Sequence, residues 1–83
     1  MKEQLNPKSL GLALGVIEAV ALFILGLLAM ATGYAVDFVN LTATFYIGYS
    51  ATIVGSIIGV VWGFVDGFVG GWLVAWLYNK FNS

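Results

Sequence analysis

The chain has 83 residues, of which 61% are hydrophobic and 8% are charged, so it is one small domain with too much apolar surface for a water-soluble protein of its length. Three lysines and four acidic residues give a net charge of −1 and no basic surface for nucleic acid. The absence of cysteine and histidine excludes disulfides, thiolate or imidazole metal sites, and Ser-His or Cys-His nucleophile pairs. We therefore expect a membrane protein that is not an enzyme and binds no cofactor and no metal.

Two apolar runs are each long enough to cross a bilayer. The first, residues 10–32, contains one charged residue, Glu18, and about 20 apolar residues suffice for a spanning helix. The second, residues 53–78, contains only Asp66, and as a helix it would be about 39 Å long at 1.5 Å per residue. The sequence therefore predicts an all-α fold, a transmembrane helical hairpin of two membrane-spanning helices.

The connection between the two runs, residues 33–52, is long for a tight turn and too apolar for a flexible linker. Asp37, Asn40 and Thr44 recur in it at helical spacing among apolar residues, which is typical of a short helix at a membrane surface. We expect an external interfacial loop that contains such a helix. The alternative is that the second membrane helix begins earlier, near Leu41.

Charge and aromatic residues predict the orientation in the membrane. The lysines lie at positions 2, 8 and 80, and the positive-inside rule therefore puts both termini, residues 1–9 and 79–83, in the cytoplasm. Aromatic residues gather near the loop and near the C-terminus, as expected at two membrane–water interfaces. The predicted interface anchors are Tyr46, Tyr49, Trp72, Trp76 and Tyr78.

Glycine recurs at every fourth position through the second run. This glycine ladder consists of Gly55, Gly59, Gly63, Gly67 and Gly71. Residues four apart share one ridge of a helix, so the ladder predicts a groove without side chains that another helix can approach closely. Because the row drifts around the helix, one neighbouring helix does not readily fill it, and we expect contacts between chains. The alternative is packing within the chain against a shorter row, Gly11, Gly15 and Ala19.

Glu18 and Asp66 fall in the middle of their runs and within about one helical turn of each other in depth. No basic residue lies between positions 9 and 79, so burial and mutual repulsion favour protonated side chains. The simplest interpretation is that a protonated acid hydrogen-bonds to a backbone or to a neighbouring helix. Contact with a partner or cofactor and a proton or ion pathway are the alternatives.

The second half of the chain carries a recognisable series of motifs. They are YIGY at 46–49, GSIIG at 55–59, WGFVDGFVGG at 62–71 and AWLYN at 75–79. With them the chain resembles a family of very short prokaryotic two-span membrane proteins of unknown function, often labelled bacteriophage-holin-like. The resemblance implies a protein of the prokaryotic cytoplasmic membrane, and the holin label implies one that oligomerises and opens lesions for a phage lysin.

Together these patterns favour a small assembly or accessory subunit. It would pack through the glycine ladder against copies of itself, as a homo-oligomer, or against a larger membrane complex in the lipid bilayer. A holin-like lesion former and a proton or ion pathway through Glu18 and Asp66 remain the alternative hypotheses.

Overall fold

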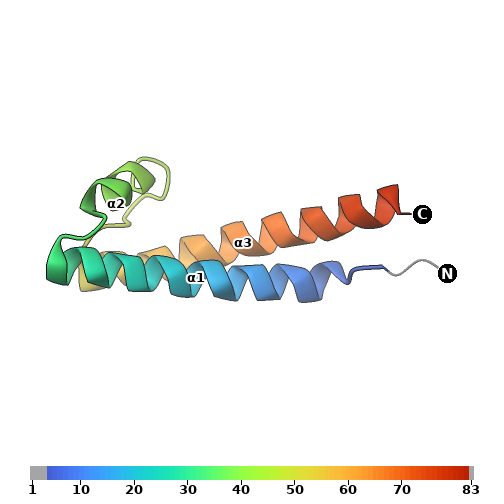
Figure 1. Cartoon of the computed structure of the whole chain (residues 1–83), viewed down its shortest axis with the longest axis horizontal. Coiled ribbons are helices and arrows are strands. Elements are labelled where there is room, and N and C mark those ends of the chain that lie inside the picture. Colours follow the sequence, from blue (N-terminus) through green and yellow to red (C-terminus); the bar gives the residue numbers. More distant parts are fainter. Residues whose placement is uncertain (1–3, 83) are drawn as a thin grey trace.

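The computed structural model describes residues 4–82, and these residues form three α-helices. Helix α1 spans Pro7–Thr32, α2 spans Val36–Thr42 and α3 spans Ile53–Phe81. Helices α1 and α3 run antiparallel, side by side, along the 50 Å length of the molecule, and α2 lies near the end where they are joined (Figure 1). The predicted all-α hairpin is confirmed, and so is the short helix in its connection.

The two long helices have the dimensions and the surface of membrane spans. Their 26 and 29 residues correspond to about 39 and 44 Å, against a hydrocarbon thickness of about 30 Å. Only 28% of the most apolar stretch of each helix is buried. The outer side of α1 exposes apolar side chains along most of its length, namely Leu12, Val16, Val20, Ile24 and Leu28. This surface is compatible with a membrane hairpin.

Local capping chemistry fixes where the long helices begin and end. Asn6 caps α1 by accepting a hydrogen bond from the Ser9 backbone N–H at 3.1 Å, and the helix ends at Gly33, whose φ of 77° suits glycine. Thr52 caps α3 by accepting from the Gly55 backbone N–H at 2.8 Å. Helix α3 therefore starts at position 53, as predicted, and the alternative of an earlier start is wrong.

Both ends of the described chain lie at the same end of the hairpin (Figure 1). The Asn79 side chain joins them: its Oδ1 accepts from the Leu5 backbone N–H at 2.8 Å, and its Nδ2 donates to the Leu5 carbonyl at 2.7 Å. Residues 1–3 and 83 of the two predicted cytoplasmic termini, Lys2 among them, lie outside the described residues.

Asn79→Leu is expected to loosen the segment that precedes α1. The change removes both hydrogen bonds to Leu5, each worth about 1 kcal/mol. Hydrogen–deuterium exchange in detergent micelles should show faster exchange at residues 4–8 and little change at the other end of the hairpin. Asn40→Leu, at an exposed position of α2, is the matched control, and equal exchange in the two variants would contradict the interaction.

Small residues occupy most of the buried positions of α1 and α3, many of them in the seam between the two helices. The buried residues of the two helices are Gly11, Gly15, Ala19, Leu22, Gly26 and Ala29 of α1, and Gly55, Ser56, Gly59, Gly63, Gly67, Gly71 and Ala75 of α3. Small residues let helix backbones approach closely, and in lipid this packing replaces the hydrophobic effect as the force that holds helices together.

Gly26 and Ser56 offer a test of this packing near the joined end. A Cβ atom at Gly26 would overlap Ser56 Oγ, which is held in place by donating to the Thr52 carbonyl at 2.6 Å. Gly26→Ala should therefore destabilise the hairpin by about 1–3 kcal/mol, measured by unfolding in mixed micelles of rising SDS content. Adding Ser56→Gly should recover much of this loss because it empties the same space. A double variant no more stable than Gly26→Ala would refute the contact.

A small hydrophobic core joins the connection to α1 near the joined end. It consists of Leu22, Ala29, Val39 and Tyr49, with Leu25, Val36, Tyr46 and Ala51 packed against it. Val39 is fully buried and Tyr49 is 2% exposed, and the Tyr49 hydroxyl donates to the Leu22 carbonyl at 2.7 Å. The connection is therefore a packed part of the fold.

After α2, residues 43–52 fold back along α3. Trp62 Nε1 donates to the Ile47 carbonyl at 2.9 Å, and Trp62 lies nine residues beyond Ile53, about 14 Å along the helix. The backbone N–H groups of residues 43–46 donate to carbonyls of α2, and that of Tyr49 donates to the Tyr46 carbonyl at 3.0 Å. This segment, here called the return segment, therefore runs toward the middle of the hairpin, where irregular backbone needs such internal partners if lipid surrounds it.

Candidate functional site

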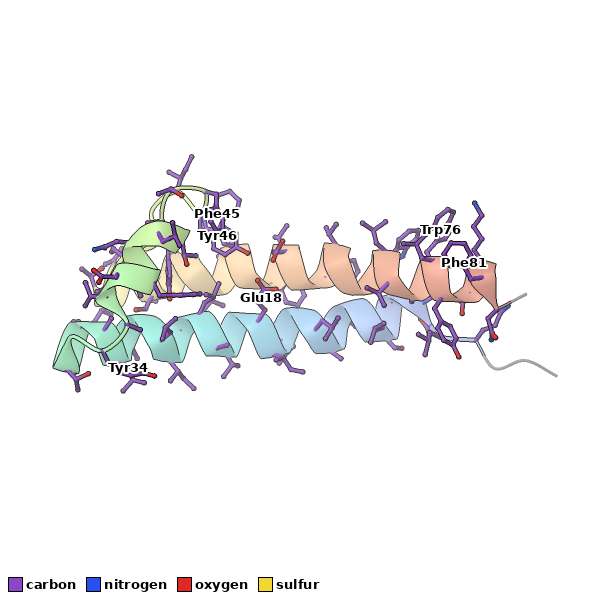
Figure 2. The ribbon with its side chains drawn as sticks, turned by 45° about the horizontal axis from the view of Figure 1, so that its top comes forward. Glu18, Tyr34, Phe45, Tyr46, Trp76 and Phe81 are labelled. Carbon is purple, nitrogen blue, oxygen red and sulfur yellow. The ribbon has the colours of Figure 1, made fainter. Side chains whose placement is uncertain are left out.

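The return segment brings one tyrosine to the two carboxylates of the long helices. The Tyr46 hydroxyl lies 2.7 Å from Asp66 Oδ2 of α3 and 3.0 Å from Glu18 Oε1 of α1. Glu18 lies between the two long helices near the middle of the hairpin, with Tyr46 on the side of α3 (Figure 2). Three side chains from three segments of the chain therefore meet at one hydroxyl group.

The number of protons limits how this cluster is bonded. A tyrosine hydroxyl has one proton to donate, and two carboxyl oxygens lie within hydrogen-bond distance of it. Both contacts can be full hydrogen bonds only when one carboxyl group is itself protonated and donates to the Tyr46 oxygen. Glu18, Tyr46 and Asp66 are thus arranged to share protons.

Aromatic contacts hold Tyr46 in this position. Its ring stacks on Trp62 of α3 with centroids 5.6 Å apart and planes inclined by 5°, and it meets the edge of Phe45 at 4.8 Å. Burial, followed by the hydrogen bonds to Asp66 and Glu18, raises the pKa of the Tyr46 phenol above its ordinary value. The phenol therefore keeps its proton as a hydrogen-bond donor at neutral pH.

An open groove extends from the carboxylates toward the end where the described chain begins and ends. Its volume is about 540 Å³, and it is lined by Leu14, Ile17, Glu18 and Ala21 of α1 and by Asp66, Gly67, Gly70, Gly71 and Val74 of α3. Most of these residues are apolar, while Asp66 is exposed and Glu18 is partly exposed. We call this feature the carboxylate groove.

The part of the glycine ladder nearest the termini packs against α1. Added Cβ atoms at Gly63, Gly67 and Gly71 would lie within 3.0 Å of backbone atoms of α1. The α1 Cα atoms near these three positions belong, in the same order, to Ala19, Gly15 and Gly11. These residues are the short row found in the sequence. The alternative of packing within the chain is therefore what the structure shows for these three glycines.

The remaining two glycines of the ladder pack against the return segment. A Cβ at Gly59 would lie 2.6 Å from the Tyr49 ring, and one at Gly55 would overlap Ser50. A fourfold spacing drifts around a helix of 3.6 residues per turn, so these two glycines face the return segment, although a Cβ at Gly59 would still lie 3.5 Å from Leu22 Cβ of α1. The expectation that the ladder is left free for another chain is wrong, because two segments of the same chain divide it between them.

The predicted interface anchors fall into two groups. Trp72, Trp76 and Tyr78 are exposed near the end where the described chain begins and ends, and Lys80 Nζ lies 5.3 Å from the centre of a Trp76 ring. Tyr46 and Tyr49 instead have internal hydrogen-bond partners. The buried Tyr49 ring cannot reach lipid headgroups, so its prediction as an anchor is wrong.

Sequence reasoning did not identify Tyr46 as the residue that contacts both carboxylates, and it also missed Trp62. The sequence places it four residues before Asp66, and therefore on the same side of a helix, which is the available signal. Its two contacts with the return segment depend on the fold of residues 43–52, which has no clear periodicity. Among the described residues, no cluster of three acidic, histidine or cysteine side chains has the geometry of a metal site.

No family model, curated protein or solved structure matches the chain. The functional argument therefore comes from the cluster of Glu18, Tyr46 and Asp66 and from the carboxylate groove beside it.

Proposed function

We propose that the chain is a non-enzymatic membrane protein that acts as an assembly or accessory subunit. The observation that carries this proposal is the open carboxylate groove, with Asp66 exposed near the middle of an otherwise apolar hairpin. An acidic side chain at the centre of a membrane helix costs about 2.5–3.5 kcal/mol on insertion scales. Contact with a partner offsets this cost, because it replaces lipid around the carboxylate with polar groups.

The internal packing supports the same proposal. The glycine ladder is occupied within the chain, and no buried polar side-chain atom of the described residues lacks a hydrogen-bond partner. The hairpin is therefore packed and hydrogen-bonded within itself. A partner can bind to its outer surface without a change in its fold.

The test is extraction of the protein from its source membrane in a mild detergent, followed by native electrophoresis. We expect migration with a complex of several chains, either copies of this one or a larger assembly. Migration as a free monomer under conditions that preserve known membrane complexes of the same extract would refute the assembly role.

A proton pathway is the second candidate, because the Tyr46 hydroxyl lies between two carboxyl oxygens. In vesicles that contain the full chain and a pH-sensitive dye, such a pathway would dissipate an imposed pH gradient. Asp66→Asn keeps the shape of the side chain and removes its titrating group. Flux that is absent, or equal in the two proteins, would exclude the pathway.

The holin-like hypothesis rests on the family resemblance and on the two-span topology. Induced expression together with a phage lysin would then cause sudden loss of membrane potential and lysis of a bacterial host. Undisturbed growth at a confirmed membrane level of the protein would exclude it.

We also propose the cytoplasmic membrane of a prokaryote as the location, with both termini inside. The lysine positions support this orientation. The described chain begins and ends at one end of the hairpin, which supports only that both termini lie on the same side (Figure 1). Because the chain has no native cysteine, single cysteines near each end and at Tyr34 can be tested with an impermeant thiol reagent. Labelling of the end positions in intact cells would refute this orientation.

A further inference from the structure

One side of the seam between α1 and α3 is covered over only part of its length. The return segment covers it from the joined end as far as Tyr46, and the carboxylate groove follows from Asp66 to Val74. That distance is about 12 Å along α3, or roughly two helical turns. The return segment and the carboxylate groove therefore follow one another along the same side of the seam, and only the groove is uncovered.

Gly70 shows that the groove has room for a closely packed neighbour. A Cβ atom at Gly70 would meet nothing within 4 Å, although Gly67 and Gly71 beside it pack against the backbone of α1. The floor of the groove therefore lacks a side chain where no segment of this chain approaches. Leu14, Ile17 and Val74 supply apolar walls that match the side chains of a membrane helix.

The charge of the groove selects the kind of neighbour. Glu18 and Asp66 both line it, and the single proton of Tyr46 cannot satisfy both as ionised groups. A second copy of this chain would bring no basic residue to this depth, because none lies between positions 9 and 79. A lysine or arginine supplies both the opposite charge and several hydrogen-bond donors.

We propose that the carboxylate groove docks a transmembrane helix of a different protein, one that carries a lysine or arginine near its middle. This inference rests on the proposed accessory function and names the class of its partner. The basic side chain lies against Glu18 and Asp66, and the backbone of the partner helix approaches Gly70. Tyr46 then donates to one carboxylate while the cation serves the other.

The probe is a synthetic leucine-rich membrane helix with one central lysine, and the matched peptide has leucine at that position. The full chain is placed in lipid vesicles with a fluorescent donor on Val65→Cys, an exposed position near the far side of α3 from Gly70. Energy transfer to acceptor-labelled peptide measures binding. We expect the lysine peptide to bind about tenfold more tightly than the leucine peptide, equivalent to about 1.4 kcal/mol.

Groove variants test whether the probe binds where we infer. Gly70→Leu should abolish binding of the lysine peptide, and Val74→Trp provides a second block if Gly70→Leu alters the helical circular dichroism. Asp66→Asn combined with Glu18→Gln should remove the preference for lysine. Val69→Leu, at an exposed position outside the groove, should leave binding unchanged.

Three results would overturn the inference. They are equal binding of the two peptides, binding of the lysine peptide that survives both Gly70→Leu and Val74→Trp, and transfer between two labelled copies of the chain that Gly70→Leu abolishes. The last result would assign the groove to a second copy. A native complex that persists in these groove variants would refute this inference and retain the accessory role, whereas a free monomer in the extract would refute that role.

Discussion

Gly67→Ala is expected to separate α1 from α3, whereas Gly70→Ala, three residues further along the same helix, should leave them packed. A Cβ atom at Gly67 would lie 2.5 Å from the Leu14 carbonyl oxygen and 2.7 Å from Gly15 Cα. These are backbone atoms, which cannot rotate aside as a side chain can. We expect a loss of about 1–3 kcal/mol or more in the free energy of unfolding, as for other overpacked sites.

The matched variant adds the same methyl group where it meets nothing. Because Gly70 has no atom within 4 Å of its Cβ position, Gly70→Ala should be neutral or stabilising by up to about 1 kcal/mol through helix propensity. Both free energies are measured by helical circular dichroism during unfolding in mixed micelles of increasing SDS content. Similar stabilities for the two variants would mean that α1 does not lie on the ladder as the structure shows.

The hairpin itself was predictable because its signal is local and strong. Two apolar runs, each with one acidic residue, specify two long helices. In the structure the Thr52 hydroxyl caps the second of them. The structure extends them modestly, to Pro7 at the start of α1 and to Phe81 at the end of α3. Neither extension changes which residues cross the middle of the hairpin.

Close packing against the glycine ladder was predictable from the sequence, but the segments that pack there were not. Fourfold spacing indicates a backbone approach but carries no information about which backbone approaches. The prediction of contacts between chains took α1 as the one segment of the same chain that could pack against the ladder. The return segment supplies the other neighbour, because Ser50 packs against Gly55 and Tyr49 packs against Gly59.

The similar depth of Glu18 and Asp66 predicted that the two side chains could lie near each other. No pattern in the sequence predicted that Tyr46 contacts both. Tyr46 stands 20 residues before Asp66 and 28 after Glu18, and it lies in a segment without regular secondary structure. Its position is set by stacking on Trp62 and by the bond from Trp62 to Ile47. Such contacts between segments distant in sequence leave no periodic pattern to find.

Tyr46→Phe is the sharpest test of the candidate site. The variant keeps the ring that stacks on Trp62 and meets Phe45, and it removes only the hydroxyl that bonds to Glu18 and Asp66. Leaving such acceptors without their donor costs about 1–3 kcal/mol. The return segment should therefore detach more easily, and the free energy of unfolding should fall by this amount.

Trp62 gives a local readout of that change. When the return segment detaches, the Trp62 indole loses both its stacking on Tyr46 and its hydrogen bond to Ile47. Hydrogen exchange at the indole N–H, followed by NMR in micelles, should become faster in Tyr46→Phe. Exchange at Trp72 and Trp76, which lie near the other end of α3, should stay the same.

Tyr34→Phe is the control for the loss of a phenol hydroxyl, because Tyr34 is 67% exposed. It should change neither the stability nor the exchange at Trp62. If Tyr46→Phe behaves like Tyr34→Phe, the three-residue cluster does not hold the return segment. If Tyr46→Phe loosens the segment and Asp66→Asn then adds little further effect, the two side chains act as one unit, as expected when they share a hydrogen bond.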